Sequence, residues 1–409
     1  MRALLLGLPE TRGRRRLIAA YAVDTFGTGL FLPLALFYFT RSTPLSASEA
    51  GLAMSLATLV ALAVAPAVGG LADRWGVKWI VVASNLVTAL GYSLYPAAQS
   101  GAAVFGCVAV VMIADRAHAA AWPAWLGGIA RSGELDAWFA LSHAVGRGAL
   151  GIGALASSLV LLDRLAGRLE LLVYLNAASS VIAAALTAST PAPARGRAEL
   201  ISGPWASIAR DRPLRALLLA QALLACAWTL PVSLLPLYMT GSLHLPAWQA
   251  PLLFGQSAIL LLIAQTSVTR ALTSMRRTRA MVAGASLYLA SLAALASAGL
   301  APLAIAAVAM VAYTAGEMCS APSAAAMAMA LAPRGLRART MAVFQLSGCV
   351  AYGLGPGLVG FLLDRGDAAA FLGLATCVIA GAAAALWSER LAPAAALWPR
   401  SHHGSGEAA

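Results

Sequence analysis

Five ionisable residues lie inside long apolar runs of this 409-residue chain: Asp24, Asp115, Arg116, Arg147 and Glu317. A charge at the centre of a membrane helix costs about 2.5–3.5 kcal/mol on insertion scales, so each of these residues is a functional candidate by default. Three acids and two arginines leave one acid in excess. A carboxyl group without a fixed counter-charge in a low-dielectric medium can bind a proton and release it when a partner approaches. The residue types therefore indicate proton binding inside a membrane.

The runs that hold these residues are long enough to cross a bilayer, which takes roughly 20 apolar residues. The chain is 60% hydrophobic and 11% charged, against about 25% charged residues in soluble domains. This composition excludes a soluble enzyme, a disordered chain and a nucleic-acid-binding domain. The sequence predicts an all-α membrane protein with twelve spans: Leu17–Phe39, Ser48–Gly70, Trp79–Ala98, Ala102–Trp122, Trp138–Leu161, Leu169–Thr190, Leu214–Tyr238, Ala247–Thr269, Met281–Leu300, Pro302–Met329, Thr340–Leu363 and Ala368–Trp387.

The placement of basic residues predicts the orientation of these spans. If alternate loops lie on opposite sides, 22 of the 28 basic residues fall on one side and 4 on the other, and the remaining two lie within spans. Basic residues favour the cytoplasmic side, so both termini are expected in the cytoplasm. The basic segment 191–213 forms a cytoplasmic linker with an interfacial helix near Trp205. It separates two pseudo-symmetric six-helix bundles, 1–190 and 214–390, and residues 391–409 form a cytoplasmic tail.

The loop after the second span carries a recognisable motif. It reads Gly69-Gly70-Leu71-Ala72-Asp73-Arg74-Trp75-Gly76-Val77-Lys78 and closely resembles the G-x-L-A-D-R-x-G-R-K motif of the major facilitator superfamily, although Val77 replaces a basic residue. The resemblance implies a cytoplasmic gate motif formed by Gly69, Asp73, Arg74, Gly76 and Lys78. The alternative is that Arg74 and Lys78 only set the topology.

A second motif points to one group within that superfamily. Asp24-Thr25-Phe26-Gly27-Thr28-Gly29-Leu30-Phe31-Leu32-Pro33 resembles the first helix of the twelve-helix drug-proton antiporters. The fifth span departs from their pattern because it has Gly146, Gly148, Gly151 and Gly153 but no proline. A similar segment with Gly355 and Pro356 occurs in the eleventh span instead. Helix packing or hinge roles are therefore expected for a set of small residues and prolines: Gly27, Gly29, Pro33, Gly151, Gly153, Gly355 and Pro356.

The resemblance also suggests a partner for Asp24, because the first and fourth helices face each other in this superfamily. Asp24 and Arg116 share a depth of about 10 Å at 1.5 Å of rise per residue, so an Asp24–Arg116 interaction is expected. Asp24 is the first candidate for the proton site, followed by Glu317 and Asp115, and the two intramembrane arginines are the charge partners. Alternatively, these charges form pairs that only fix helix register. His118 and His143 near span ends are further candidates for a proton relay.

Other polar residues in the spans are candidates for lining a substrate cavity: Asn85, Asn176, Gln221, Trp228, Gln256 and Gln345. The alternative for each polar side chain is a hydrogen bond between helices. The only lysine is Lys78 and no P-loop is present, which argues against an ATP-driven pump. The five cysteines show no metal-binding or disulfide spacing, and no metal, cofactor or enzyme activity is expected.

These observations predict proton-coupled export of small hydrophobic or amphiphilic compounds, by alternating access, across a bacterial cytoplasmic (inner) membrane. The expected protein is an efflux antiporter that contributes to drug resistance. Its expected partners are a small-molecule substrate, protons and membrane lipids but no nucleic acid, and it is expected to be a monomer. Two alternatives stay open: a proton symporter that imports a small polar nutrient, and a non-transporting sensor or scaffold.

Overall fold

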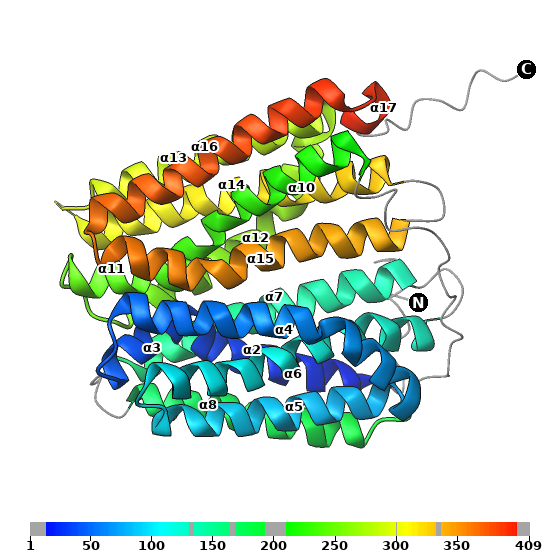
Figure 1. The fold of residues 1–409 in the computed structure, drawn as a ribbon, viewed down its shortest axis with the longest axis vertical. Helices are drawn as coiled ribbons and strands as arrows, with labels where there is room; N and C mark the ends of the chain where they lie inside the picture. The colour runs from blue at the N-terminus through cyan, green and yellow to red at the C-terminus, as the bar shows by residue number, and fades with distance from the viewer. Residues whose placement is uncertain are drawn as a thin grey trace, which may run out of the picture. The chain divides into compact units, whose positions relative to one another are not determined.

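The computed structural model describes residues 14–130, 135–162, 168–192, 210–299, 301–332 and 337–398, without the side chains of 64–74, 135–137, 140 and 337–339. Every regular element in these ranges is a helix, which confirms the all-α class (Figure 1). Ten segments of the described chain are long and apolar enough to cross a membrane. Two further helices, α4 (Ala47–Trp75) and α7 (Leu135–Val160), coincide with the expected second and fifth spans. The count of twelve spans stays a prediction.

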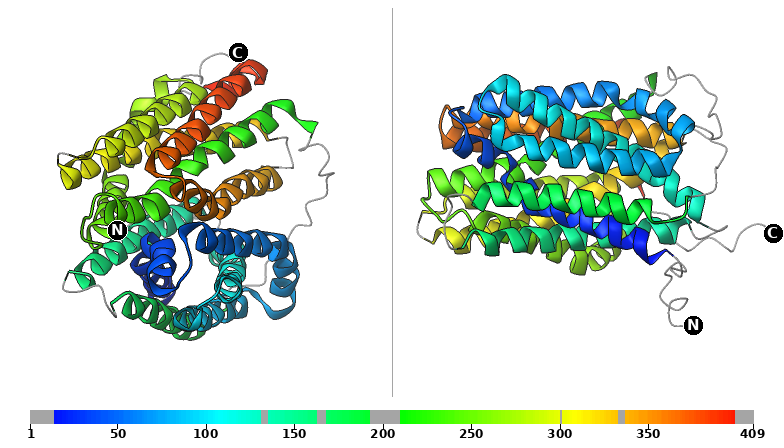
Figure 2. Two further views of the ribbon diagram at one scale, coloured as in Figure 1. Left: turned by 60° about the vertical axis from the view of Figure 1, so that its left-hand side comes forward. Right: turned by 90° about the horizontal axis from the view of Figure 1, so that it is seen from below.

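The helices group into two compact units. The first unit comprises Met1–Ala198, Leu230–Leu262 and Gly353–Asp367, and the left view of Figure 2 shows its blue and cyan helices partly end-on. It contains α4 and α7, part of α12 (Gln249–Ala271), the end of α15 (Arg337–Leu363), and these complete elements: α2 (Arg15–Phe31), η1 (Leu32–Leu34), α3 (Ala35–Ser42), α5 (Val77–Leu94), η2 (Tyr95–Ala97), α6 (Gly101–Ile129), α8 (Arg168–Ala188), η4 (Leu230–Leu234) and α11 (Leu235–Gly241).

Local sequence explains where these helices bend and end. Pro33 interrupts the first span with the single 3₁₀ turn η1, because proline lacks the N–H that an α-helix needs. Gly76 separates α4 from α5 with φ of 83°, a left-handed conformation that glycine adopts without steric cost. The Ser100 side chain caps α6 by accepting a hydrogen bond from the backbone N–H of Ala103. In the seventh span, Pro231 lies in the π-helix η4.

Close packing inside the first unit uses glycine where helices cross. Helix α2 packs on α7 and α8, while α6 packs on α4 and α5. A Cβ atom at Gly27 would overlap the Ser179 side chain of α8, and one at Gly29 would overlap the backbone of Leu150 in α7. A Cβ atom at Gly153 would in turn overlap the carbonyl oxygen of Phe26. Small residues thus let these helix backbones approach closely.

The segments of α12 and α15 in this unit pack in the same way. Gly151 of α7 contacts Ala258 of α12. In α15, Pro356 lies inside the helix without ending it, and buried Gly355 precedes it. The next residue, Gly357, donates its backbone N–H to the Ser55 hydroxyl of α4 at 2.9 Å.

The second unit comprises Glu199–Thr229, Ile263–Tyr352 and Ala368–Ala409. Helices α13 and α14 run side by side in it, and the Gly284 and Gly316 backbones lie in close contact. Glu389 accepts hydrogen bonds from Arg276, at 2.6 Å, and from the Thr278 hydroxyl. The unit holds the remaining parts of α12 and α15, all of α16 (Asp367–Leu391) after Asp367, and these complete elements: α10 (Arg212–Ala225), η3 (Cys226–Trp228), η5 (Leu272–Ser274), α13 (Arg277–Ala296), α14 (Pro302–Leu331) and α17 (Ala394–Leu397).

Helices α12 and α15 each contribute to both units, and the expected boundary at 191–213 stays a prediction. Residues 193–209, with the expected interfacial helix at Trp205, and residues 399–409 of the tail lie outside the described ranges. At the end of the linker, Asp211 caps α10 by accepting the backbone N–H of Leu214 at 3.0 Å. The division into two six-helix bundles stays a prediction.

Candidate functional site

Asp24 of α2 lies beside His118 of α6. The Nδ1 atom of His118 is 3.5 Å from Oδ2 of Asp24, and the two side chains are 14% and 18% exposed. Arg116, the expected partner of Asp24, forms an ion pair with its neighbour Asp115, and the Asp24–Arg116 interaction stays a prediction. Residues 116 and 118 are two positions apart, about 200° around a helix. His118 and Arg116 therefore leave α6 in different directions.

An aromatic stack lies next to this pair on the same two helices. The rings of Tyr21 and Trp122 are parallel within 12°, with centroids 4.4 Å apart. Tyr21 precedes Asp24 by three positions and Trp122 follows His118 by four, which places each pair on one helix face. Because α2 and α6 run in opposite directions, the stack forms a second layer about one turn from the Asp24–His118 pair.

The third helix, α7, supports the stack. The indole Nε1–H of Trp122 donates to the Ser142 hydroxyl at 3.2 Å, and Gly146 lies against the Tyr21 hydroxyl. A small cavity of about 10 Å³ borders Tyr21, Trp122 and Ser142, with room for about one water molecule. The stack is therefore fixed from both sides and has little free space around it.

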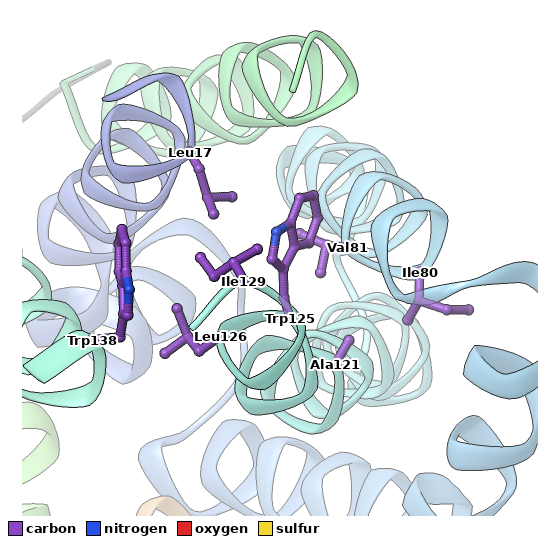
Figure 3. Close-up of a cluster of buried hydrophobic side chains, with 8 residues drawn as sticks. All are labelled: Leu17, Ile80, Val81, Ala121, Trp125, Leu126, Ile129 and Trp138. Carbon is purple, nitrogen blue, oxygen red and sulfur yellow. The ribbon is translucent and has the colours of Figure 1, made fainter. Parts of the chain in front are cut away.

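A third layer is apolar and closes this end of the four helices α2, α5, α6 and α7 (Figure 3). Leu17 lies seven positions before Asp24, and Trp125 lies seven positions after His118. The two belong to one buried cluster, completed by Ile80, Val81, Ala121, Leu126, Ile129 and Trp138. Figure 3 shows Leu17, Leu126 and Ile129 pointing toward one another. The Asp24–His118 pair is thus separated from this end of the helices by an aromatic layer and an apolar layer.

Further charges surround the pair. Asp115 acts electrostatically on Asp24, although its own side chain is 49% exposed and is paired with Arg116. Arg147 of α7 and Asp24 both interact electrostatically with the Tyr21 hydroxyl. The arrangement brings a carboxylate and an imidazole, two kinds of side chain that act in proton transfer elsewhere, to the same place. No group of three or more metal-ligating side chains occurs among the described residues.

Glu317, the second proton candidate, lies in α14 of the second unit. It is buried with 6% of its surface exposed. Tyr313 and Ser320, on the same face of α14 by spacing, both contact Tyr288 of α13: the Tyr rings are 5.4 Å apart, and the hydroxyls of Tyr288 and Ser320 are 3.1 Å apart. Glu317 therefore belongs to the dense packing between α13 and α14.

The loop motif is described only in part. Gly69, Asp73 and Arg74 are described by their backbone alone, which is helical to Trp75. Gly76 makes the turn. Lys78 donates from Nζ to the backbone carbonyls of Ala188 and Thr190 at 2.7 Å each. This lysine therefore caps the end of α8, a role that the sequence did not suggest.

The residues expected to line a cavity are in different environments. Asn85 and Asn176 are buried in the first unit, at 3% and 1% exposure, and Asn176 lies against Gly27. Gln221, Trp228 and Gln256 are partly buried, whereas Gln345 is exposed. Burial of both asparagines is consistent with the alternative of interhelical contact. Lining of a substrate cavity stays a prediction for the whole set.

Comparison with known proteins places these features in a family. The family model described as Major Facilitator Superfamily matches residues 17–356. No curated protein matches the chain.

Several solved structures share the fold at low sequence identity. The nucleoside transporter NupG matches with a TM-score of 0.72 and 13% identity, over 92% of this chain and 98% of its own. A bacterial homologue of the human lysosomal transporter Spinster, in an inward-facing and unoccupied conformation, has a TM-score of 0.72 and 13% identity, over 95% and 98%. The D-xylose-proton symporter has a TM-score of 0.71 and 15% identity, over 93% and 97%. The chain belongs to the Major Facilitator Superfamily and is a membrane transporter, not an enzyme.

Proposed function

We propose that this transporter couples proton movement to the export of small hydrophobic or amphiphilic compounds by alternating access. The observation that carries the proposal is the Asp24 carboxyl group, which is largely buried in an apolar helix next to His118. Placing a carboxyl group inside a membrane span costs free energy, and such residues mark functional sites by default. Its neighbour is the side chain that most readily changes charge near neutral pH.

The charge distribution supports an orientation for this transport. The 22-to-4 distribution of basic residues favours cytoplasmic termini in a bacterial cytoplasmic membrane. The apolar and aromatic layers beneath Asp24 then lie on the cytoplasmic side. In this orientation Asp24 exchanges protons through an opening other than this end of the four helices.

Import is the second candidate function. One structural neighbour is named a D-xylose-proton symporter and another a nucleoside transporter, and either name fits a nutrient importer. The same proton site serves both directions, because only the relative movement of substrate and proton differs. Export is favoured by the likeness of Asp24–Pro33 to the first helix of drug-proton antiporters.

The test uses purified protein in vesicles that contain a pH-sensitive dye, together with susceptibility of cells that express it. Ethidium, uridine and xylose serve as probes of a lipophilic cation, a nucleoside and a sugar. For export, the wild type should protect cells against ethidium and move protons opposite to it, and Asp24→Asn should lose both effects.

The matched control is Asp364→Asn, the same chemical change at an exposed position at the end of α15. It should behave like the wild type. Uridine or xylose that enters together with protons would instead establish import. Proton movement that ignores all three probes, equally in wild type and Asp24→Asn, would reject antiport of this kind.

A further inference from the structure

We propose that His118 relays protons to and from Asp24, receiving a proton at Nε2 and passing one from Nδ1. This inference rests on the proposed function, because it assumes that Asp24 is the proton site. It adds a second residue to that site, on a different helix. It also assigns separate roles to the two nitrogens of the imidazole.

The geometry gives His118 two distinct sides. Nδ1 faces the carboxylate of Asp24 at 3.5 Å. This distance is long for a hydrogen bond, so the two groups must approach before a proton passes. Nε2 is buried and has no hydrogen-bond partner among the described residues. Leaving a buried ring nitrogen unpaired costs about 1–3 kcal/mol, so the position needs a reason other than stability.

The relay balances in atoms and charge. It starts with a neutral imidazole that carries hydrogen on Nδ1 and faces an ionised Asp24. A proton that binds Nε2 allows the Nδ1 proton to move to Oδ2 of Asp24. One N–H bond forms, one N–H bond breaks and one O–H bond forms. Both side chains end neutral, and the reverse sequence returns the proton.

The aromatic stack borders the His118 ring. The His118 ring lies 5.9 Å from the Trp122 ring, which is itself held by Tyr21 and Ser142. The antiparallel course of α2 and α6 places this stack one layer from Asp24. In this packing Nδ1 is the ring nitrogen that faces the carboxylate.

Other titratable groups near the pair are limited. Tyr21 on α2, Asp115 and Arg116 on α6, and His143 and Arg147 on α7 belong to its surroundings. The described titratable groups of the other packed helices lie toward helix ends: Glu49 on α4, Lys78 and Tyr92 on α5, and Arg168, Glu170 and Tyr174 on α8. Asp24 and His118 can therefore be substituted without changing any of these other titratable groups.

The first test needs no substrate. The wild type in lipid is titrated while infrared absorption reports the protonated carboxyl band, which is assigned to Asp24 by its loss in Asp24→Asn. Two interacting groups titrate in two steps that belong to the pair, so the wild-type band should follow a two-step curve. His118→Asn, and His118→Gln as a second variant, should give a single step. The control His244→Asn, at an exposed histidine that follows α11, should keep two steps.

The second test addresses the relay itself. After a rapid pH jump, the carboxyl band should form on the order of 100-fold more slowly in His118→Ala, the lower end of what a positioned acid–base group contributes. Imidazole added to the buffer should restore part of the rate. A purely structural role would not give this rescue.

The outcomes separate the two proposals. If the band persists in Asp24→Asn, Asp24 is not the proton site and the proposed function loses its basis. If Asp24→Asn removes the band but the wild type titrates in one step, or His118→Ala is as fast as the wild type, only the relay is wrong.

Discussion

Asp24 and Asp115 are both acids inside apolar helices, yet their surroundings differ. Asp24 is largely buried beside His118, whereas Asp115 is half-exposed and paired with Arg116 on its own helix. The sequence ranked Asp24 before Asp115, and the two acids also differ in exposure in the structure.

This difference gives the first prediction. Asp115→Asn should retain proton-coupled transport, because Asp115 is already paired with Arg116, while Asp24→Asn should abolish it. The measurement is proton flux in vesicles at equal amounts of inserted protein. A loss in Asp115→Asn as complete as in Asp24→Asn would contradict the assignment.

His118 shows what could and could not be predicted at this scale. The spacing of Tyr21 to Asp24 and of His118 to Trp122 is visible in the sequence and places each pair on one helix face. Which face of α6 turns toward α2 depends on packing against α4 and α5, which the sequence does not state. Depth and the family resemblance therefore pointed to Arg116, and His118, two positions further along, was not paired with Asp24 from the sequence.

At the scale of elements, apolar length predicted the helices well because each span must satisfy its backbone groups internally. Pro33, one of the packing or hinge candidates, interrupts its span because proline lacks the N–H group of an α-helix, but the 3₁₀ turn there and the π-helix at Pro231 were not predicted. The glycines of the first span were expected to pack helices. Their partners in α7 and α8 required the structure.

The crossing of α2 and α7 gives the second prediction. Gly153→Ala should lower the melting temperature in detergent, because the added Cβ would overlap the carbonyl oxygen of Phe26. Overpacking of this kind costs about 1–3 kcal/mol. Gly106→Ala in α6 is the matched control, since a Cβ there meets nothing within 4 Å. It should be neutral or slightly stabilising, and equal effects of both substitutions would contradict the packing argument.

The cap on α8 gives the third prediction. Lys78→Met should destabilise the protein by about 1–3 kcal/mol, because the carbonyls of Ala188 and Thr190 lose a charged donor. Hydrogen exchange should accelerate in the last turn of α8. Lys78→Arg keeps the charge and should restore most of the protection. Unchanged exchange in Lys78→Met would mean that this lysine serves topology alone.

At the scale of the whole molecule, composition and charge placement were sufficient for the class of protein but not for its substrate. Low identity to transporters named for a nucleoside and for xylose shows that one fold carries different cargoes. The substrate depends on a few side chains that line the transport path, such as those proposed at Gln221 or Gln256. The fold constrains them little.

Orientation is a property of the whole chain, and it gives the last prediction. The 22-to-4 distribution of basic residues places the loop at Gln99 outside and the loop at Ser274 inside the cell. Both positions are exposed. In a background with the five native cysteines replaced by alanine, Gln99→Cys should react with a membrane-impermeant maleimide in intact cells. Ser274→Cys should react only after the membrane is opened. The reverse pattern would invert the orientation, so that the layers beneath Asp24 would close the outer side and proton entry would come from the cytoplasm.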